Sequence, residues 1–205
     1  MSSVIGPIAL ALHGGAGSEF ARFATVERQA MEQALSEYLS AGEKLLREGR
    51  PSVEVVEYVV LLLEDDPQFN AGRGSAFNAV GGHELDASIM DGRTRAAGAV
   101  GGLTTVKNPI SLARLVMTRT QNCFFVADGA DQLAAELGMP LVANITMVTP
   151  KEIDQFRIEE SQWHGCLVEH DDFHAQRREC RSVLTGNHTA AQDHNRTRKI
   201  SHRKQ

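Results

Sequence analysis

The chain has 205 residues, a formal net charge of -5, 42% hydrophobic and 23% charged residues, a balance typical of a globular soluble protein. This length suits one domain with a sizeable core, or part of a larger protein. The acidic balance argues against a nucleic-acid-binding protein, and no apolar run reaches the roughly 18 residues of a membrane span.

The first predicted element is a short buried strand over residues 4–12, which ends in the glycine-rich sequence HGGAG. Because this apolar start lacks positive charge, we interpret it as a strand and not as a secretory signal. Residues 25–47 carry apolar side chains at i, i+3 and i+4 spacing, which predicts an amphipathic helix. A second helix begins at Ser52, a plausible N-cap, and ends before Pro67.

The middle of the chain predicts a β-hairpin. Residues 83–90 alternate between apolar and polar, with Leu85, Ala87 and Ile89 on one side. Asp91-Gly92 is a strong hairpin signal. The expected partner strand, 95–103, is rich in glycine and alanine, which indicates that another element packs very close to it.

After the hairpin, Asn108 as cap and Pro109 in the first turn predict a helix. We expect its buried face to hold Leu112, Leu115 and Val116. A short strand over 124–127 and a helix over 129–137 follow. The predicted order β-α-α-β-β-α-β-α is a mixed α/β fold, whose hairpin excludes a purely parallel sheet.

The chain divides by pattern into a main domain over residues 1–150, a weakly structured extension over 151–185 and a flexible basic tail or linker over 186–205. Within the extension, residues 151–160 have helical character. The tail has two functional alternatives: a nucleic-acid-binding arm, and a metal site formed by His188, His194 and His202. A solvated terminus is the ordinary explanation.

The chain has three cysteines and no C-x-x-C pair, which predicts reduced thiols in a cytoplasmic protein. They are Cys123, Cys166 and Cys180. Cys123 lies in the apolar run CFFV, so we expect it in the core.

Two glycine-rich loops could bind a ligand. The first, residues 13–17, lies between a strand and a helix as phosphate loops do, but it lacks the Lys-Ser/Thr of a P-loop and the dinucleotide spacing. Its His13 could act as a base, or could be a structural, hydrogen-bonded histidine. The second loop, residues 70–74, follows the acidic run Glu64-Asp65-Asp66. Carboxylates beside free carbonyls could attract a cation, although the spacing is not an EF-hand; a solvent-facing helix end is the alternative.

Glu84 and Asp86 lie two residues apart on one face of the predicted strand. Two such carboxylates could perform acid–base chemistry, or could accept hydrogen bonds from backbone donors around a loop. Asp86 stands among apolar neighbours and must be paired if it is buried.

Four motifs in this order resemble the plant-type L-asparaginase / isoaspartyl peptidase family of N-terminal-nucleophile hydrolases: HGGAG, FNAGRGSAFN, HELDASIMDG and AGAVGGLTTVKNPISLARLVM. The resemblance covers residues 8 to about 138. It implies an αββα sandwich made by a precursor that cleaves itself into an α and a β subunit, working as an (αβ)2 heterotetramer. The N-terminal threonine of the β subunit would attack the side-chain amide of asparagine or a β-aspartyl peptide bond, with its own α-amino group as base.

The family cleaves itself between Gly and Thr, and this chain contains no Gly-Thr dipeptide. The chain therefore resembles an α subunit, with residues 1–150 as its part of the sandwich, or a truncated precursor. We expect it to be inactive alone, to lack the substrate-binding residues of the β half, and to leave an apolar sheet face uncovered. The alternative is an inactive truncated homologue that at most binds or regulates a partner.

The resemblance also implies site residues. A structural sodium ion would be held by the backbone carbonyls of Leu63, Glu64, Asp66, Phe69, Ala71 and Arg73, with no organic cofactor. Asn70 matches a residue that lies close to the nucleophile and supports it by hydrogen bonding.

Overall fold

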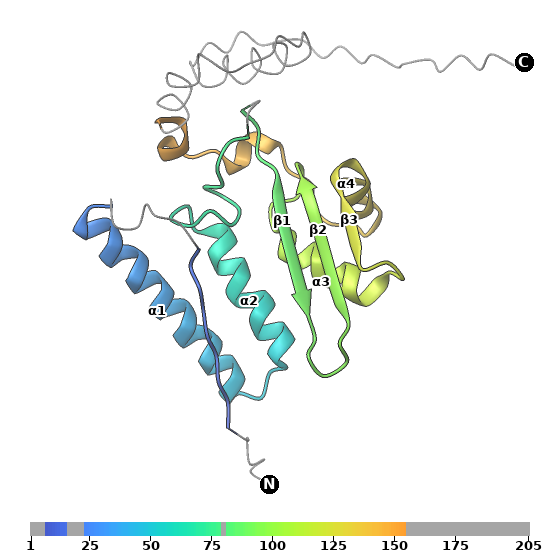
Figure 1. Ribbon diagram of the computed structural model, residues 1–205, viewed down its shortest axis with the longest axis horizontal. Coiled ribbons are helices and arrows are strands. Elements are labelled where there is room, and N and C mark those ends of the chain that lie inside the picture. Colours follow the sequence, from blue (N-terminus) through green and yellow to red (C-terminus); the bar gives the residue numbers. More distant parts are fainter. Residues whose placement is uncertain (1–6, 16–22, 79–80, 155–205) are drawn as a thin grey trace, which may run out of the picture. The chain divides into compact units, whose positions relative to one another are not determined.

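A computed structural model describes residues 7–15, 23–78 and 81–154, all of which lie in the unit Met1–Val168 (Figure 1). Its elements follow the order α1 (Thr25–Arg47), α2 (Ser52–Asp65), β1 (Leu85–Met90), β2 (Ala97–Leu103), α3 (Pro109–Arg119), β3 (Phe124–Val126), α4 (Ala127–Glu136) and a 3-10 turn η2 (Asn144–Met147). A short helix begins at Pro150 and continues to Asp154, where the described residues end.

Each element predicted between residues 25 and 137 is present, and the mixed α/β class is confirmed. The ends differ from the prediction by one or two residues, which is the usual uncertainty of element boundaries. Pro51, not Ser52, occupies the N-cap position of α2, and Ser52 is the first helical residue. The basic tail, with its three histidines, and two of the cysteines lie outside the described residues.

The predicted first strand is not formed in the part that the structure describes. Residues 7–12 have no ladder partner among the described residues, although Ile8, Leu10 and Leu12 alternate with exposed neighbours. Leu10 packs so closely on α1 that a Cβ added to Gly42 would lie 2.6 Å from Leu10 Cδ2. The segment therefore lies against helices, as Figure 1 shows, and a strand requires a neighbouring strand that is absent from the described part of the chain.

The sheet has the order β1-β2-β3, with β1 and β2 antiparallel and β3 parallel to β2. The hairpin predicted at Asp91-Gly92 is confirmed, but its loop is longer than two residues. Arg95 N–H donates to Asp91 O at 2.7 Å, and Arg95 itself takes the left-handed conformation with φ 63°. Asp91 side-chain oxygens accept from Arg93 N–H and the Thr94 hydroxyl, which fixes the turn.

Helix α3 covers one face of β1 and β2, and together they form the main core with α4. Leu112 and Val116 are fully buried as predicted, and Leu115 is half-buried. The close packing expected from the small residues of β2 is confirmed at Gly98, because a Cβ there would lie 2.1 Å from Ala113 O of α3. A second core joins α1 and α2 around Phe69.

The opposite face of the sheet is open in the part of the chain described. Met90, Phe124 and Val126 are 58%, 58% and 52% exposed, and a hollow of about 710 Å³ lies over Ala99 and its neighbours. Cys123, expected in the core, is exposed because it lies in the turn that leads into β3 at the sheet edge. None of the helices described is both long and apolar enough to cross a membrane.

Candidate functional site

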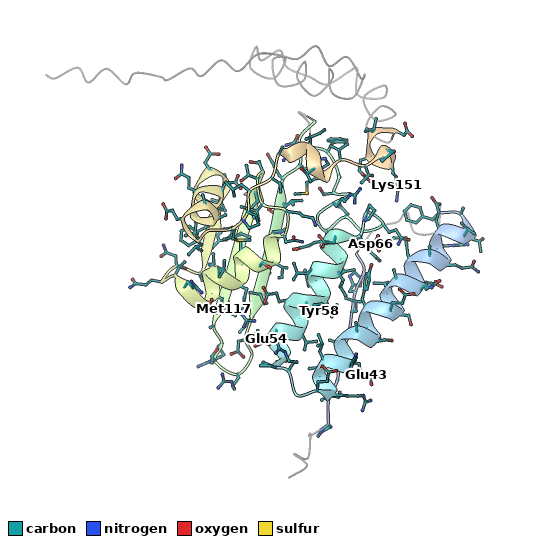
Figure 2. The ribbon with its side chains drawn as sticks, turned by 180° about the vertical axis from the view of Figure 1, so that it is seen from behind. Glu43, Glu54, Tyr58, Asp66, Met117 and Lys151 are labelled. Atoms are coloured by element: carbon teal, nitrogen blue, oxygen red, sulfur yellow. The ribbon has the colours of Figure 1, made fainter. Side chains whose placement is uncertain are left out.

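The loop that follows α2 begins at Asp66, which Figure 2 places at the C-terminal end of that helix. Gln68 N–H donates to Asp66 Oδ1 at 2.9 Å, and Phe69 N–H donates to Asp66 O at 3.1 Å. The Tyr38 hydroxyl of α1 donates to Asp66 Oδ2 at 2.7 Å. Burial and the Asp66 carboxylate raise the pKa of Tyr38 to about 12, so the phenol remains a hydrogen-bond donor.

This loop folds back onto the last turn of α2. Arg73 N–H donates to Glu64 O at 2.8 Å, and Gly74 N–H donates to Met147 O at 3.1 Å. Position 72 must be glycine, because a Cβ there would lie 2.6 Å from Glu64 O. Residues 63–74 therefore form a closed loop held at both ends.

The six residues expected to bind sodium all lie on this closed loop. Pro67 has no N–H, so it cannot donate to the Leu63 carbonyl as an ordinary helical residue would. Backbone oxygens are ligands that hard cations accept, and each carbonyl has two lone pairs. The residues present are thus compatible with a cation held by main-chain oxygens. No group of three or more His, Cys, Asp or Glu side chains in the described ranges could hold a metal ion.

Asn70 lies at the middle of the loop, and its side chain is fixed from within the same segment. Ala76 N–H donates to Asn70 Oδ1 at 2.7 Å, which orients the carboxamide. Asn70 also lines a cavity of about 390 Å³ between α2, the loop and β1. The polar residues that line this cavity are Glu64, Asn70, Ser75, Glu84, Asp86 and Ser88.

Glu64 is a buried carboxylate, 1% exposed, that joins α2 to the start of α3. Its Oε1 accepts from Ile110 N–H at 2.8 Å, and its Oε2 accepts from Asn108 Nδ2 at 3.1 Å. Burial raises the pKa of Glu64 to about 8, against the lowering effect of these hydrogen bonds. Asn108 holds the predicted N-cap position of α3, but its side chain donates to Glu64 and Asp65 and does not cap the helix. Glu64 instead accepts from the backbone N–H of Ile110, one of the first-turn N–H groups that have no partner within the helix.

The two carboxylates predicted on the strand both lie at the cavity, and both are exposed residues. Asp86 Oδ1 accepts from Gly102 N–H at 2.7 Å, where the pairing of β1 with β2 shifts register. The hydrogen-bonding interpretation is thereby confirmed for Asp86, whose carboxylate serves a backbone donor at a β-bulge. Acid–base chemistry by this pair stays a prediction.

The structure adds a buried pair that sequence reasoning missed. Ser75 Oγ lies 3.0 Å from His83 Nδ1, and the two residues are 4% and 1% exposed. Burial lowers the pKa of His83, which favours the neutral imidazole. The only signal in the sequence was a histidine directly before an alternating strand.

The first glycine-rich loop is described only to Gly15. His13 is exposed, and its Nδ1 accepts from Gly15 N–H at 3.3 Å, which agrees with the structural interpretation of this histidine. The remainder of the loop lies outside the described residues.

The motifs agree with comparisons to known proteins. A family model described as Asparaginase matches residues 6–186. The chain is 43% identical over 145 residues to the isoaspartyl peptidase/L-asparaginase of Homo sapiens, covering 71% of this chain and 46% of the relative. It is 42% identical over 154 residues to the probable isoaspartyl peptidase/L-asparaginase 2 of Arabidopsis thaliana, covering 75% and 47%. It is 43% identical over 148 residues to the isoaspartyl peptidase of Salmonella typhimurium, covering 71% and 47%. The chain spans about half the length of the curated relatives it matches.

Proposed function

This chain belongs to the asparaginase family, and we propose that it supplies the α subunit of an amidohydrolase that acts on L-asparagine and β-aspartyl dipeptides. The observation that carries the proposal is the closed loop with Asn70 at the wall of a cavity, within a chain related to isoaspartyl peptidases. Hydrolysis by this chain co-expressed with a threonine-initiated second half tests it.

The nucleophile in this proposal is a threonine at the N-terminus of a β subunit. Its hydroxyl attacks the amide carbon while its α-amino group takes the hydroxyl proton; the C–N bond then breaks and the amine leaves with that proton. Water hydrolyses the resulting ester, which releases the acid and restores the threonine hydroxyl. This chain has no Gly-Thr dipeptide at which self-cleavage of the family type could occur. Asn70 would support the threonine by hydrogen bonding, because Ala76 N–H orients its carboxamide and the residue lines the cavity.

The β subunit would also complete the fold. The open sheet face around Met90, Phe124 and Val126 has small residues at its centre, so a second sheet could approach closely to form an αββα sandwich. The unpaired segment 7–12 would gain a strand partner. Two such αβ pairs would give the (αβ)2 heterotetramer, and failure of the two halves to co-purify would contradict this assembly.

Sodium binding at the closed loop is a further part of the proposal. Replacing sodium with choline at constant ionic strength should lower the thermal midpoint of the complex, because an ion that binds only the folded state stabilises it by about 2.7 kcal/mol at a hundred times its dissociation constant. In Gly72→Ala the thermal midpoint should be the same in sodium and in choline, because the added Cβ would lie 2.6 Å from Glu64 O and distort the loop. Gly92→Ala, which meets nothing within 4 Å, is the matched control. A wild-type midpoint that is the same in both salts would contradict the site.

A catalytically inactive homologue, which at most binds or regulates a partner, is the second candidate. The coding sequence that follows Gln205 separates the two candidates. An in-frame Gly-Thr-Val-Gly segment would contradict the proposal of an inactive homologue, and a stop codon would support that proposal.

A further inference from the structure

His83 is a buried residue that stands behind the cavity wall. It lies two residues before β1 and is 1% exposed. Its ring packs on Phe77 with centroids 4.5 Å apart and 34° between the planes. Its Nδ1 lies 3.0 Å from Ser75 Oγ. Ser75 lines the cavity, whereas His83 is not among the described residues that line it.

The backbone of His83 is fixed by Asn144 of η2. His83 N–H donates to Asn144 Oδ1 at 2.8 Å, and Asn144 Nδ2 donates to His83 O at 2.8 Å. The same Nδ2 also donates to Thr104 O at 2.9 Å, just beyond the end of β2. One asparagine side chain therefore fixes both backbone groups of His83, and the contacts with Phe77 and Ser75 hold its ring.

Two hydrogen bonds connect this support to Asn70. The first is the contact between His83 and Ser75. The second joins the next residue, Ala76, whose N–H donates to Asn70 Oδ1 at 2.7 Å. Because Ser75 and Ala76 are consecutive, a displacement of Ser75 moves the donor that orients the Asn70 carboxamide.

Burying the imidazole ring of His83 costs free energy, which its contact with Ser75 must offset. Its Nε2 is buried and has no hydrogen-bond partner among the described residues. A buried polar atom without a partner is unfavourable, and an apolar side chain would avoid that penalty. What an imidazole supplies here, and an apolar side chain does not, is polar interaction with the segment of Ser75 and Ala76, in which the contact with Ser75 Oγ is 3.0 Å long.

We propose that His83 is a positioning residue for Asn70, acting through Ser75 and Ala76 from behind the cavity wall. The importance of Asn70 rests on the proposed function. The positioning itself is a property of this chain and does not require hydrolysis to be measured.

Hydrogen exchange of the Ala76 amide in the full chain tests the proposal, with the Ala99 amide as reference because it donates to Cys123 O in the sheet. His83→Phe should accelerate exchange at Ala76 about tenfold and change Ala99 little, since one hydrogen bond in the chain of contacts is lost. His83→Gln, which can still bond to Ser75, should restore part of the protection.

Val116→Ala is the matched control. Val116 is fully buried in α3 and does not belong to the loop, so the cavity that alanine leaves should accelerate hydrogen exchange at Ala76 and Ala99 together. Unchanged exchange at Ala76 in His83→Phe, or equal acceleration at Ala76 and Ala99, would overturn the proposal. If His83→Phe does not fold, Ser75→Ala removes the same bond, and normal Ala76 exchange in that variant would overturn it. Failure of the wild-type complex to hydrolyse asparagine contradicts the proposed function alone.

Discussion

Asn70→Ala should lower the kcat of the assembled enzyme by roughly 10²-fold, the usual effect of removing one preorganised hydrogen-bonding group beside a reacting centre. Asn70 lines the cavity, and its carboxamide is held by Ala76 N–H at 2.7 Å. Alanine removes both the group that would meet the threonine and the acceptor that orders the loop. Steady-state hydrolysis of asparagine measures the change.

Two variants separate the two consequences of losing Asn70. Asn70→Asp keeps an oxygen for Ala76 N–H but loses the amide donor, so kcat should fall while the thermal midpoint stays near that of the wild type. Asn122→Ala, at an exposed turn before β3, is a control of the same residue type and should leave kcat unchanged. A wild-type kcat in Asn70→Ala would contradict the supporting role.

Gly98→Ala should destabilise the chain by more than about 4 kcal/mol, among the largest effects of a single substitution. Its Cβ would lie 2.1 Å from Ala113 O and 2.5 Å from Met117 N, and both are backbone atoms of α3. Figure 2 marks Met117 on that helix. Because backbone atoms cannot rotate away, the helix must separate from β2 and open the main core.

The urea midpoint of Gly98→Ala, or its soluble yield if it does not fold, measures the loss. Gly92→Ala in the hairpin loop is the matched control, since its Cβ meets nothing within 4 Å, and its stability should stay within about 0.5 kcal/mol of the wild type. Equal midpoints for the two variants would show that α3 does not pack on Gly98 as described.

The fold between residues 25 and 137 was predictable because its signals are local. Helical spacing, the Asp91-Gly92 turn and the small residues of β2 are each patterns of a few neighbouring positions. The close packing of α3 on Gly98 was predictable in the same way, because β2 is rich in glycine and alanine. The strand expected at residues 4–12 is absent over residues 7–12, the part that the structure describes, for a different reason. Apolar alternation permits a strand, but pairing depends on a neighbour, and residues 7–12 lie on α1 and α2 instead.

The candidate site was predictable only in part. The glycines and the preceding acidic run marked the loop at residues 70–74 as a possible cation site, but only the motif resemblance gave Asn70 a role. Glu64 caps a helix that begins 45 residues later, and His83 is clamped by Asn144 across 61 residues. Only the folded chain brings these residues together, so the sequence did not predict the role of Glu64 or that of His83. Cys123 was misplaced because an apolar run at a sheet edge looks like one in the core.

The rate of ammonia release from L-asparagine, by this chain co-expressed with a second half that begins with threonine, tests the proposed α-subunit role. We expect the two halves to co-purify and release ammonia, and neither half to be active alone. Replacing the partner's first threonine with alanine should abolish the rate without preventing assembly. Two halves that assemble but release no ammonia from asparagine or a β-aspartyl dipeptide, or that do not assemble, would contradict that role.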